Sequence, residues 1–165
     1  MKGTDVKEHA ELYLNTTVED SAVLMLINES LNMIGDLALN DQEVTITTSV
    51  EGEWKPLPDD TTNVKAVYSG NNAVDDWYVR GMRIRFQRPG TYQVVIRQMI
   101  PEIESLSDEI QVHPLFKMAI LSYVRGMLKM IDDDQSADGQ ALLAQFKEES
   151  LKAFNLLERI RNRGI

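Results

Sequence analysis

The chain has 165 residues, of which 43% are hydrophobic and 26% are charged, and its formal net charge at pH 7 is −9. This length and composition favour one folded domain with a sizeable core and exclude a globally disordered chain. The sequence contains no cysteine, which excludes a disulfide framework and any metal site built from cysteine ligands.

Apolar segments in this sequence are short. The longest covers residues 22–27, far below the roughly 20 residues that a membrane-spanning helix needs. The first residues show no signal-peptide organisation. We therefore expect a soluble chain that is not secreted and has no membrane partner.

Charge is divided unevenly along the chain. Residues 1–79 carry 4 basic and 15 acidic side chains, a net charge of −11, whereas residues 80–165 carry 13 and 11, a net charge of +2. An acidic protein repels phosphate backbones, which disfavours specific nucleic-acid binding as the main role. This uneven charge has two explanations. It either forms an acidic surface that keeps the protein soluble, or it lets oppositely charged patches of two subunits, or of the protein and a partner, dock on each other.

Two helices are predicted in the first forty residues. The first covers residues 4–14, and Thr16 and Glu19 fit a capping box for the second. The second helix should end near residues 39–41. Its apolar residues recur at helical spacing and form one stripe: Val23, Leu26, Ile27, Ile34, Leu37 and Ala38.

Strand patterns follow. Apolar and hydroxyl side chains alternate over residues 42–50, which predicts a half-buried strand, and residues 51–52 suit a hairpin turn. Residues 56–63 contain two prolines and predict a loop. A short strand over residues 64–68 is followed by the turn-rich residues 69–72.

A β-hairpin is the clearest local prediction. Apolar residues alternate over residues 82–86 and again over residues 92–96. Pro89 and Gly90 lie between these segments, where a type II turn requires a fixed negative φ and then a positive one. We therefore expect the two segments to pair as neighbouring antiparallel strands.

The last third predicts two long helices. Pro101 ends the strands, and Pro114 suits the first turn of a helix, where its missing N–H costs nothing. The short connection between the two helices predicts antiparallel packing. Their apolar stripes are Phe116, Ile120, Tyr123, Val124, Met127, Leu128 and Ile131 in the first helix, and Leu142, Leu143, Phe146, Ala153, Phe154, Leu157 and Ile160 in the second.

These elements together predict the α+β fold class. We expect a single domain over residues 1–165, in which an antiparallel helical bundle is formed by residues 4–40 and 114–162. The bundle combines the N-terminal helix with the two C-terminal helices. A central β-rich insertion, hairpin-like or sandwich-like, is expected over residues 42–100.

The acidic break between the last two helices is the sharpest candidate for a ligand site. Asp134, Ser136 and Asp138 alternate before Gly139, as at the start of a calcium-binding helix–loop–helix loop. The twelfth position of such a loop needs a bidentate glutamate, and here it is the neutral Gln145. We therefore favour a solvated interhelical turn with helix-capping carboxylates, with weak ion binding as the alternative.

Other chemistry-bearing residues form no motif. His9 and His113 are far apart and fit no metal-ligand spacing. The sequence also lacks a phosphate-binding glycine loop and a nucleophile motif. We therefore predict no catalytic residue, no cofactor, no metal ion and no enzymatic activity. Only a pair of catalytic carboxylates without a recognisable motif would support an enzyme.

Two groups of arginines are candidates for binding. The first group, Arg83, Arg85, Arg88 and Arg97, with Tyr92 nearby, would suit a nucleic-acid platform, but a sheet face exposed to water is the favoured interpretation. The second group lies at the C-terminal end and consists of Arg159, Arg161 and Arg163. These cations complement the dipole of the last helix or dock on an acidic partner.

Several short elements carry a resemblance to a known family. They are Ser-Asp-Glu at residues 107–109, His-Pro at residues 113–114, the Asp-rich break at residues 132–138, and Ala-Gln-Phe at residues 144–146. With these elements, the last third resembles the C-terminal part of head-to-tail adaptor (connector) proteins of tailed bacteriophages. Residues 21–35 are similar to the opening helix of the tail-tubular adaptors of short-tailed phages.

The resemblance implies a structural virion protein of the neck or tail, assembled in the host cytoplasm. Such a protein forms a homo-oligomeric ring, expected to be a dodecamer, beneath the portal protein. It joins the head to a tail or nozzle protein and extends the DNA channel, through which DNA passes without sequence-specific binding. Arg159, Arg161, Arg163 and Ile165 are then the candidate docking residues. The alternative is a small soluble α+β binding module for a host protein or a small ligand.

Overall fold

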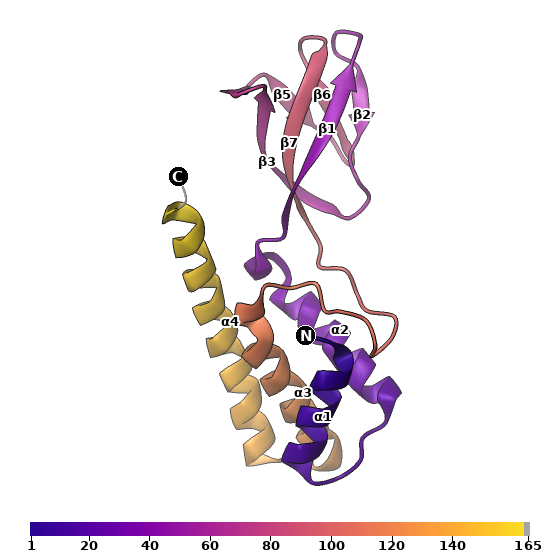
Figure 1. Cartoon of the computed structure of the whole chain (residues 1–165), viewed down its shortest axis with the longest axis vertical. Coiled ribbons are helices and arrows are strands. Elements are labelled where there is room, and N and C mark those ends of the chain that lie inside the picture. Colours follow the sequence, from indigo (N-terminus) through magenta and orange to yellow (C-terminus); the bar gives the residue numbers. More distant parts are fainter. Residues whose placement is uncertain (164–165) are drawn as a thin grey trace. The chain divides into compact units, whose positions relative to one another are not determined.

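The computed structural model describes residues 1–163 of the chain and the side chains of residues 1–162 (Figure 1). Helices and antiparallel sheets are both present, so the predicted α+β fold class is confirmed. Within the one predicted domain the chain forms two compact units. The helical unit comprises residues 1–39 and the chain from residue 100 onward, and the β unit comprises residues 40–99.

The helical unit is built around its third helix. Its elements are α1 (Gly3–Leu14), α2 (Asp20–Ile34), the 3-10 turns η1 (Gly35–Ala38) and η2 (Pro114–Phe116), α3 (Lys117–Asp132) and α4 (Ala137–Arg163). Helix α3 packs against α1 and α2 and also against α4. The core of the unit includes Val6, Ala10, Val23, Leu26, Ile27, Leu31, Ile34, Phe116, Ile120, Val124, Phe146, Ala153 and Leu157.

The predicted capping box at the start of the second helix is wrong. Helix α2 begins at Asp20, and its N-cap residue Glu19 makes no capping hydrogen bond with its side chain. Thr16 therefore precedes the N-cap and is not the capping residue of α2. A residue of α1 instead stabilises the loop between α1 and α2, because a carboxylate oxygen of Glu11 accepts a hydrogen bond from the backbone N–H of Val18 at 3.0 Å.

Helix α2 also ends earlier than predicted. Gly35 has a φ of +46°, a conformation that glycine adopts without a Cβ clash, and it terminates the α-helix after Ile34. The chain continues as the 3-10 turn η1, in which Ala38 is buried. The apolar stripe therefore extends past the helix, although the helix itself stops.

Helices α3 and α4 approach each other closely through two glycines. A Cβ atom on Gly126 would lie 3.1 Å from the carbonyl oxygen of Gly139, from Cβ of Leu142 and from Cγ of Leu143. A Cβ atom on Gly139 would lie 2.9 Å from the side chain of Met130. The two helices run antiparallel, as predicted, and the absence of side chains at these glycines allows the backbones to meet (Figure 1).

The predicted stripes of these helices are mostly buried, except at two ends. Ile131, at the C-terminal end of α3, is 61% exposed, and Ile160, near the end of α4, is 58% exposed. Both residues continue the helical spacing of the stripe. They are exposed because they lie at helix ends, beyond the part of each helix that packs in the core of the bundle.

The β unit consists of two antiparallel sheets. The first has the strand order β1 (Asp41–Thr48), β7 (Gly90–Gln98), β3 (Thr61–Ser69), β4 (Asn72–Ala73), and the second has the order β2 (Trp54–Pro56), β6 (Arg83–Phe86), β5 (Trp77–Val79). Apolar residues of both sheets form one core: Leu57, Val64, Val67, Ile84, Phe86, Tyr92, Val94 and Ile96. The unit is therefore a small sandwich.

The hairpin predicted from residues 82–96 is wrong. Strand β6 pairs with β2 and β5, whereas β7 pairs with β1 and β3. Gly90 is not among the described glycines with a positive φ, so the predicted type II turn is absent there. The rings of Phe86 and Tyr92 stack with their centroids 4.0 Å apart and their planes 6° apart. The two apolar faces therefore meet across the sandwich and do not lie side by side in one sheet.

The other strand predictions are partly confirmed. Residues 64–68 lie within β3, but this strand begins earlier, at Thr61, so the loop predicted over residues 56–63 is too long. The turn at residues 51–52 is present, with Gly52 at a φ of +71°. The strands on either side of this turn pair with different partners, and it therefore makes no hairpin.

Residues 100–113 contain no helix or long strand, yet they complete the core of the helical unit. Ile100, Ile103, Leu106 and Ile110 are all buried. Asn28 of α2 holds this segment through two hydrogen bonds of 3.0 Å, because its amide donates to the carbonyl of Ile103 and accepts from the N–H of the same residue. One side chain thus replaces the backbone partners that a strand would have supplied.

Replacing Asn28 with alanine is expected to lower the free energy of unfolding by about 2 kcal/mol, because both backbone groups of Ile103 lose their partner in a partly buried place. Urea denaturation measures this change. Asn32→Ala is the matched control on the same helix, because the side chain of Asn32 is exposed and bonds to the exposed carboxylate of Glu102. The control should change stability by less than about 0.5 kcal/mol, and equal effects of the two variants would contradict the prediction.

Candidate docking surfaces

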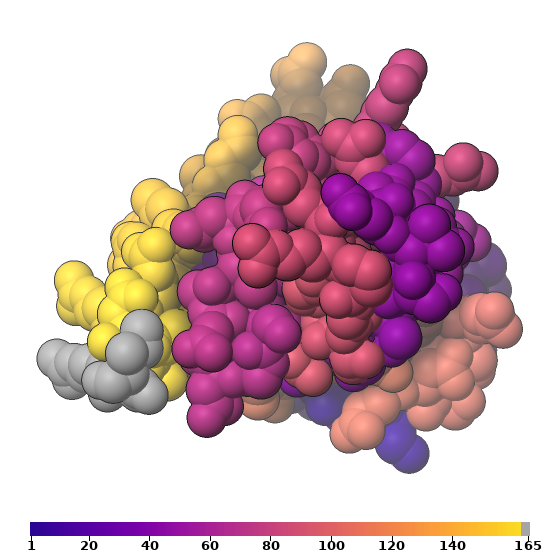
Figure 2. All heavy atoms as spheres, turned by 90° about the horizontal axis from the view of Figure 1, so that it is seen from above, coloured from indigo at the N-terminus to yellow at the C-terminus, as the bar shows by residue number. Residues whose placement is uncertain are grey.

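The C-terminal turns of α4 extend beyond the helix on which α4 packs. Helix α3 has 16 residues and α4 has 27. At about 1.5 Å per residue, the helices are about 24 Å and 40 Å long. Among the side chains that the structure describes, Leu157 is the last buried one, and residues 158–162 are all exposed. Figure 1 shows the yellow end of α4 continuing past the start of α3, and Figure 2 shows the side chains of these turns at the surface.

This helix end combines cations with apolar side chains. Arg159 and Arg161 are exposed, and between them lies Ile160. Leu156, one turn earlier, is 47% exposed. The predicted docking residues Arg159 and Arg161 are therefore accessible, whereas the side chain of Arg163 and the whole of Ile165 lie outside the described residues. An apolar strip beside guanidinium groups suits docking on an acidic surface.

The other predicted group of arginines is not brought together. Arg97 lies in the first sheet, where its Nε donates to Oδ1 of Asp41 at 2.7 Å, and both side chains are at most 13% exposed. Tyr92 is buried in the sandwich, and its hydroxyl donates to the carbonyl of Arg88 at 2.7 Å. Arg83 and Arg85 belong to the second sheet. The nucleic-acid platform considered for this group is therefore not formed.

Arg85 instead lies close to two aromatic rings, an arrangement that was not predicted from the sequence. Its guanidinium carbon lies 5.0 Å from the ring centroid of Trp54 and 5.1 Å from that of Tyr78. These two residues are its cross-strand partners on β2 and β5. Cation–π attraction holds the guanidinium between the rings. Only the register of the second sheet could have revealed this arrangement.

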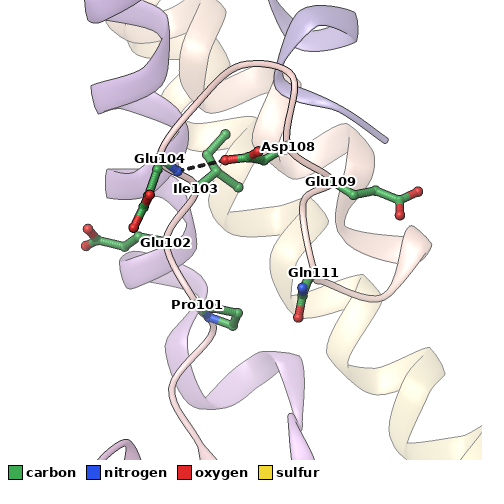
Figure 3. A pocket seen from close by; sticks show the side chains of 7 residues that line it. All are labelled: Pro101, Glu102, Ile103, Glu104, Asp108, Glu109 and Gln111. Carbon is green, nitrogen blue, oxygen red and sulfur yellow. Dashed lines mark hydrogen bonds between the residues drawn. The ribbon is translucent and has the colours of Figure 1, made fainter.

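An acidic hollow of about 360 Å³ lies on the helical unit (Figure 3). Its lining includes Glu102, Glu104, Asp108 and Glu109. Asp108 closes a turn, because its Oδ2 accepts hydrogen bonds from the backbone N–H groups of Glu104, at 3.1 Å, and Ser105, at 2.8 Å. Glu102 and Glu109 point in opposite directions in Figure 3. The carboxylates therefore spread over the surface and do not converge on one point.

The acidic break between α3 and α4 forms a turn, as predicted. The carboxylate of Asp133 accepts from the N–H of Gln135 at 3.0 Å. The cap of α4 comes from the hydroxyl of Ser136, which accepts from the N–H of Gly139 at 3.1 Å, and not from a carboxylate. In the part of the chain that the structure describes, no three His, Cys, Asp or Glu residues are grouped so that they could hold a metal ion.

His113 and Tyr123 make local structural hydrogen bonds. Nδ1 of His113 accepts from the N–H of Leu115 at 3.3 Å and caps η2, whereas His9 is exposed on α1. Tyr123 donates to a carboxylate oxygen of Glu29 at 3.2 Å. Burial, and then the negative charge of Glu29, raises the pKa of Tyr123 above its ordinary value. This phenol therefore stays protonated and ties α3 to α2.

No protein-family model matches this chain, and no curated protein is similar to it at a significant level. Over the described residues, every helix is too short or too polar to cross a lipid bilayer. The resemblance to phage adaptors therefore rests on its short motifs. One of them, residues 107–109, lies in the irregular segment before η2, where Glu109 makes only an isolated bridge with Lys2.

Proposed function

We propose that this chain is a structural adaptor of a tailed-bacteriophage neck, without enzymatic activity. It forms a homo-oligomeric ring, expected to be a dodecamer, beneath the portal protein. The ring joins the head to a tail or nozzle protein and extends the DNA channel. The observation that carries this proposal is the end of α4, where Arg159, Ile160 and Arg161 project beyond the core of the bundle.

Such a helix end supports docking on a larger partner. Its guanidinium groups suit carboxylates of an acidic surface, and its exposed Leu156 and Ile160 supply apolar area that association would bury. The portal protein is the partner that the adaptor resemblance implies. The chain as a whole has a net charge of −9, and acidic side chains that face the channel would repel phosphate groups and let DNA pass without sticking.

The test combines the full chain with portal rings encoded by the same genome, followed by sedimentation and negative-stain imaging. The wild-type chain is expected to add a ring to the portal. Arg159→Glu/Arg161→Glu should weaken this binding at least about tenfold, because two attractive contacts become repulsive. Lys65→Glu/Lys147→Glu is the matched control with the same change of charge on two exposed lysines, and it should bind normally.

A chain that stays monomeric and does not bind the portal would overturn the proposal. That result would favour the alternative, a small binding module for a host protein or a small ligand. Equal binding by the wild type and the arginine variant would leave a portal adaptor without the proposed docking element.

A further inference from the structure

The outer face of the second sheet is a basic and aromatic surface. Ile84 and Phe86 of β6 point into the sandwich, so the alternate residues Arg83 and Arg85 lie on the opposite face. Residues paired directly across the strands lie on the same face of the sheet. Arg85 pairs with Trp54 and Tyr78, and Arg83 pairs with Pro56, so these three residues lie beside the two arginines. We call this set, together with the exposed Arg80 that follows β5, the arginine–aromatic face.

No carboxylate neutralises this face within the described residues. Arg80, Arg83 and Arg85 take part in none of the ion pairs there, although the whole chain has 26 acidic side chains and only 17 lysines and arginines. Three unpaired positive charges on one small sheet attract an acidic partner. Trp, Tyr and Arg are also the residues most enriched in the energetic centres of protein interfaces.

The arrangement favours a protein partner over a nucleic acid. The rings of Trp54 and Tyr78 are already engaged by Arg85, so these ring faces are not available for stacking on bases. A guanidinium held between rings keeps its N–H donors at its edge, where they match the two oxygens of a carboxylate. The side chain is also ordered before binding, which lowers the entropy cost of association.

The acidic hollow carries the complementary charge on the same chain. Glu102, Glu104 and Glu109 are exposed, and none of them is in an ion pair among the described residues. The hollow lies beside α2, because Glu102 and Ile103 are bonded to that helix. The hollow is lined by residues between positions 101 and 111, whereas Arg159 and Arg161 lie near the end of α4, so the two surfaces are made of different residues and can take different partners.

We propose that the arginine–aromatic face of one copy docks on the acidic hollow of a second copy. The two surfaces differ, so the contact is head-to-tail, and repetition closes a ring or extends a filament. This proposal rests on the ring assembly proposed above and names the contact that would form it. The partner is a second copy of this chain, recognised through carboxylates that meet guanidinium groups.

The test is a charge exchange with two variants of the full chain. One variant carries Arg80→Glu/Arg83→Glu, and the other carries Glu104→Arg/Glu109→Arg. Analytical ultracentrifugation of each variant alone, with and without portal rings, should show self-association at least about tenfold weaker than that of the wild type. A 1:1 mixture should restore association, because each altered face then meets an oppositely charged partner. Circular dichroism checks that both variants are folded.

The outcomes separate this contact from the proposed function. If the wild type forms rings on the portal and the variants do so equally well, or if the mixture restores nothing, the contact is wrong and the adaptor function stands. If the wild type is monomeric with and without the portal, both proposals fail. Binding of a DNA oligonucleotide that is lost in Arg80→Glu/Arg83→Glu would assign the face to nucleic acid and overturn the self-docking. The Lys65→Glu/Lys147→Glu variant should associate like the wild type.

Discussion

Replacing Phe86 with alanine is expected to lower the free energy of unfolding of the β unit by about 3–5 kcal/mol. The side chain is completely buried, and its ring stacks on Tyr92 from the opposite sheet. Alanine would remove this contact and leave a cavity between two thin sheets. The β unit has few other large buried side chains among its described residues, so neighbouring groups cannot easily refill the space.

Native-state hydrogen exchange with urea denaturation measures this effect for each unit separately. Protection should fall in the strands of residues 40–99, while the buried amides of α3 keep theirs, because Phe86 belongs to a core distinct from that of the helices. Val50→Ala is the control, since Val50 is 59% exposed and should change stability by less than about 0.5 kcal/mol. A loss below about 1 kcal/mol for Phe86→Ala would contradict a sandwich core centred on this ring.

Replacing Gly126 with leucine is expected to destabilise the helical unit by about 3 kcal/mol. Even a Cβ atom at this position would lie 3.1 Å from the backbone oxygen of Gly139, which a flexible side chain cannot relieve. The larger leucine would have to occupy space that Leu142 and Leu143 already fill. Leucine has the higher helix propensity by up to about 1 kcal/mol, but overpacking of α3 against α4 outweighs this gain.

Thermal and urea unfolding of the variant measure this loss. Ala144→Leu is the matched control on α4, because it adds a comparable apolar side chain at an exposed position. The control should stay within about 0.5 kcal/mol of the wild type. A Gly126→Leu variant as stable as the control would show that α3 and α4 do not depend on close backbone contact.

Periodicity predicts elements well and their partners poorly. The stripes around Val23, Phe116 and Phe146 locate α2, α3 and α4, because burial on one side of a helix imposes its spacing on the sequence. Alternation over residues 82–86 and 92–96 likewise marks two strands with one buried face each. It cannot distinguish a neighbouring strand from one across a sandwich, because both arrangements bury the same alternate residues.

One of the candidate docking surfaces could be predicted from the sequence, and the other could not. The arginines at the end of α4 are visible in the sequence, since they lie close together along the chain beyond the apolar stripe. Trp54, Tyr78 and Arg85 are separated by 24 and 7 residues along the chain and share no motif. They meet only because β2 and β5 pair on either side of β6.

The α+β class, the order of the four α-helices and of strands β1, β3, β6 and β7, the acidic net charge and the cationic end of the last helix could all be derived from the sequence alone, whereas β2, β4 and β5 were not predicted. Each of the derived features follows from local residue patterns or from composition. The pairing of the strands, the stacking of Phe86 on Tyr92 and the completion of the helical core by residues 100–113 through Asn28 became clear only from the folded chain. These features depend on contacts between residues far apart in the chain, and local spacing carries no information about which distant groups meet.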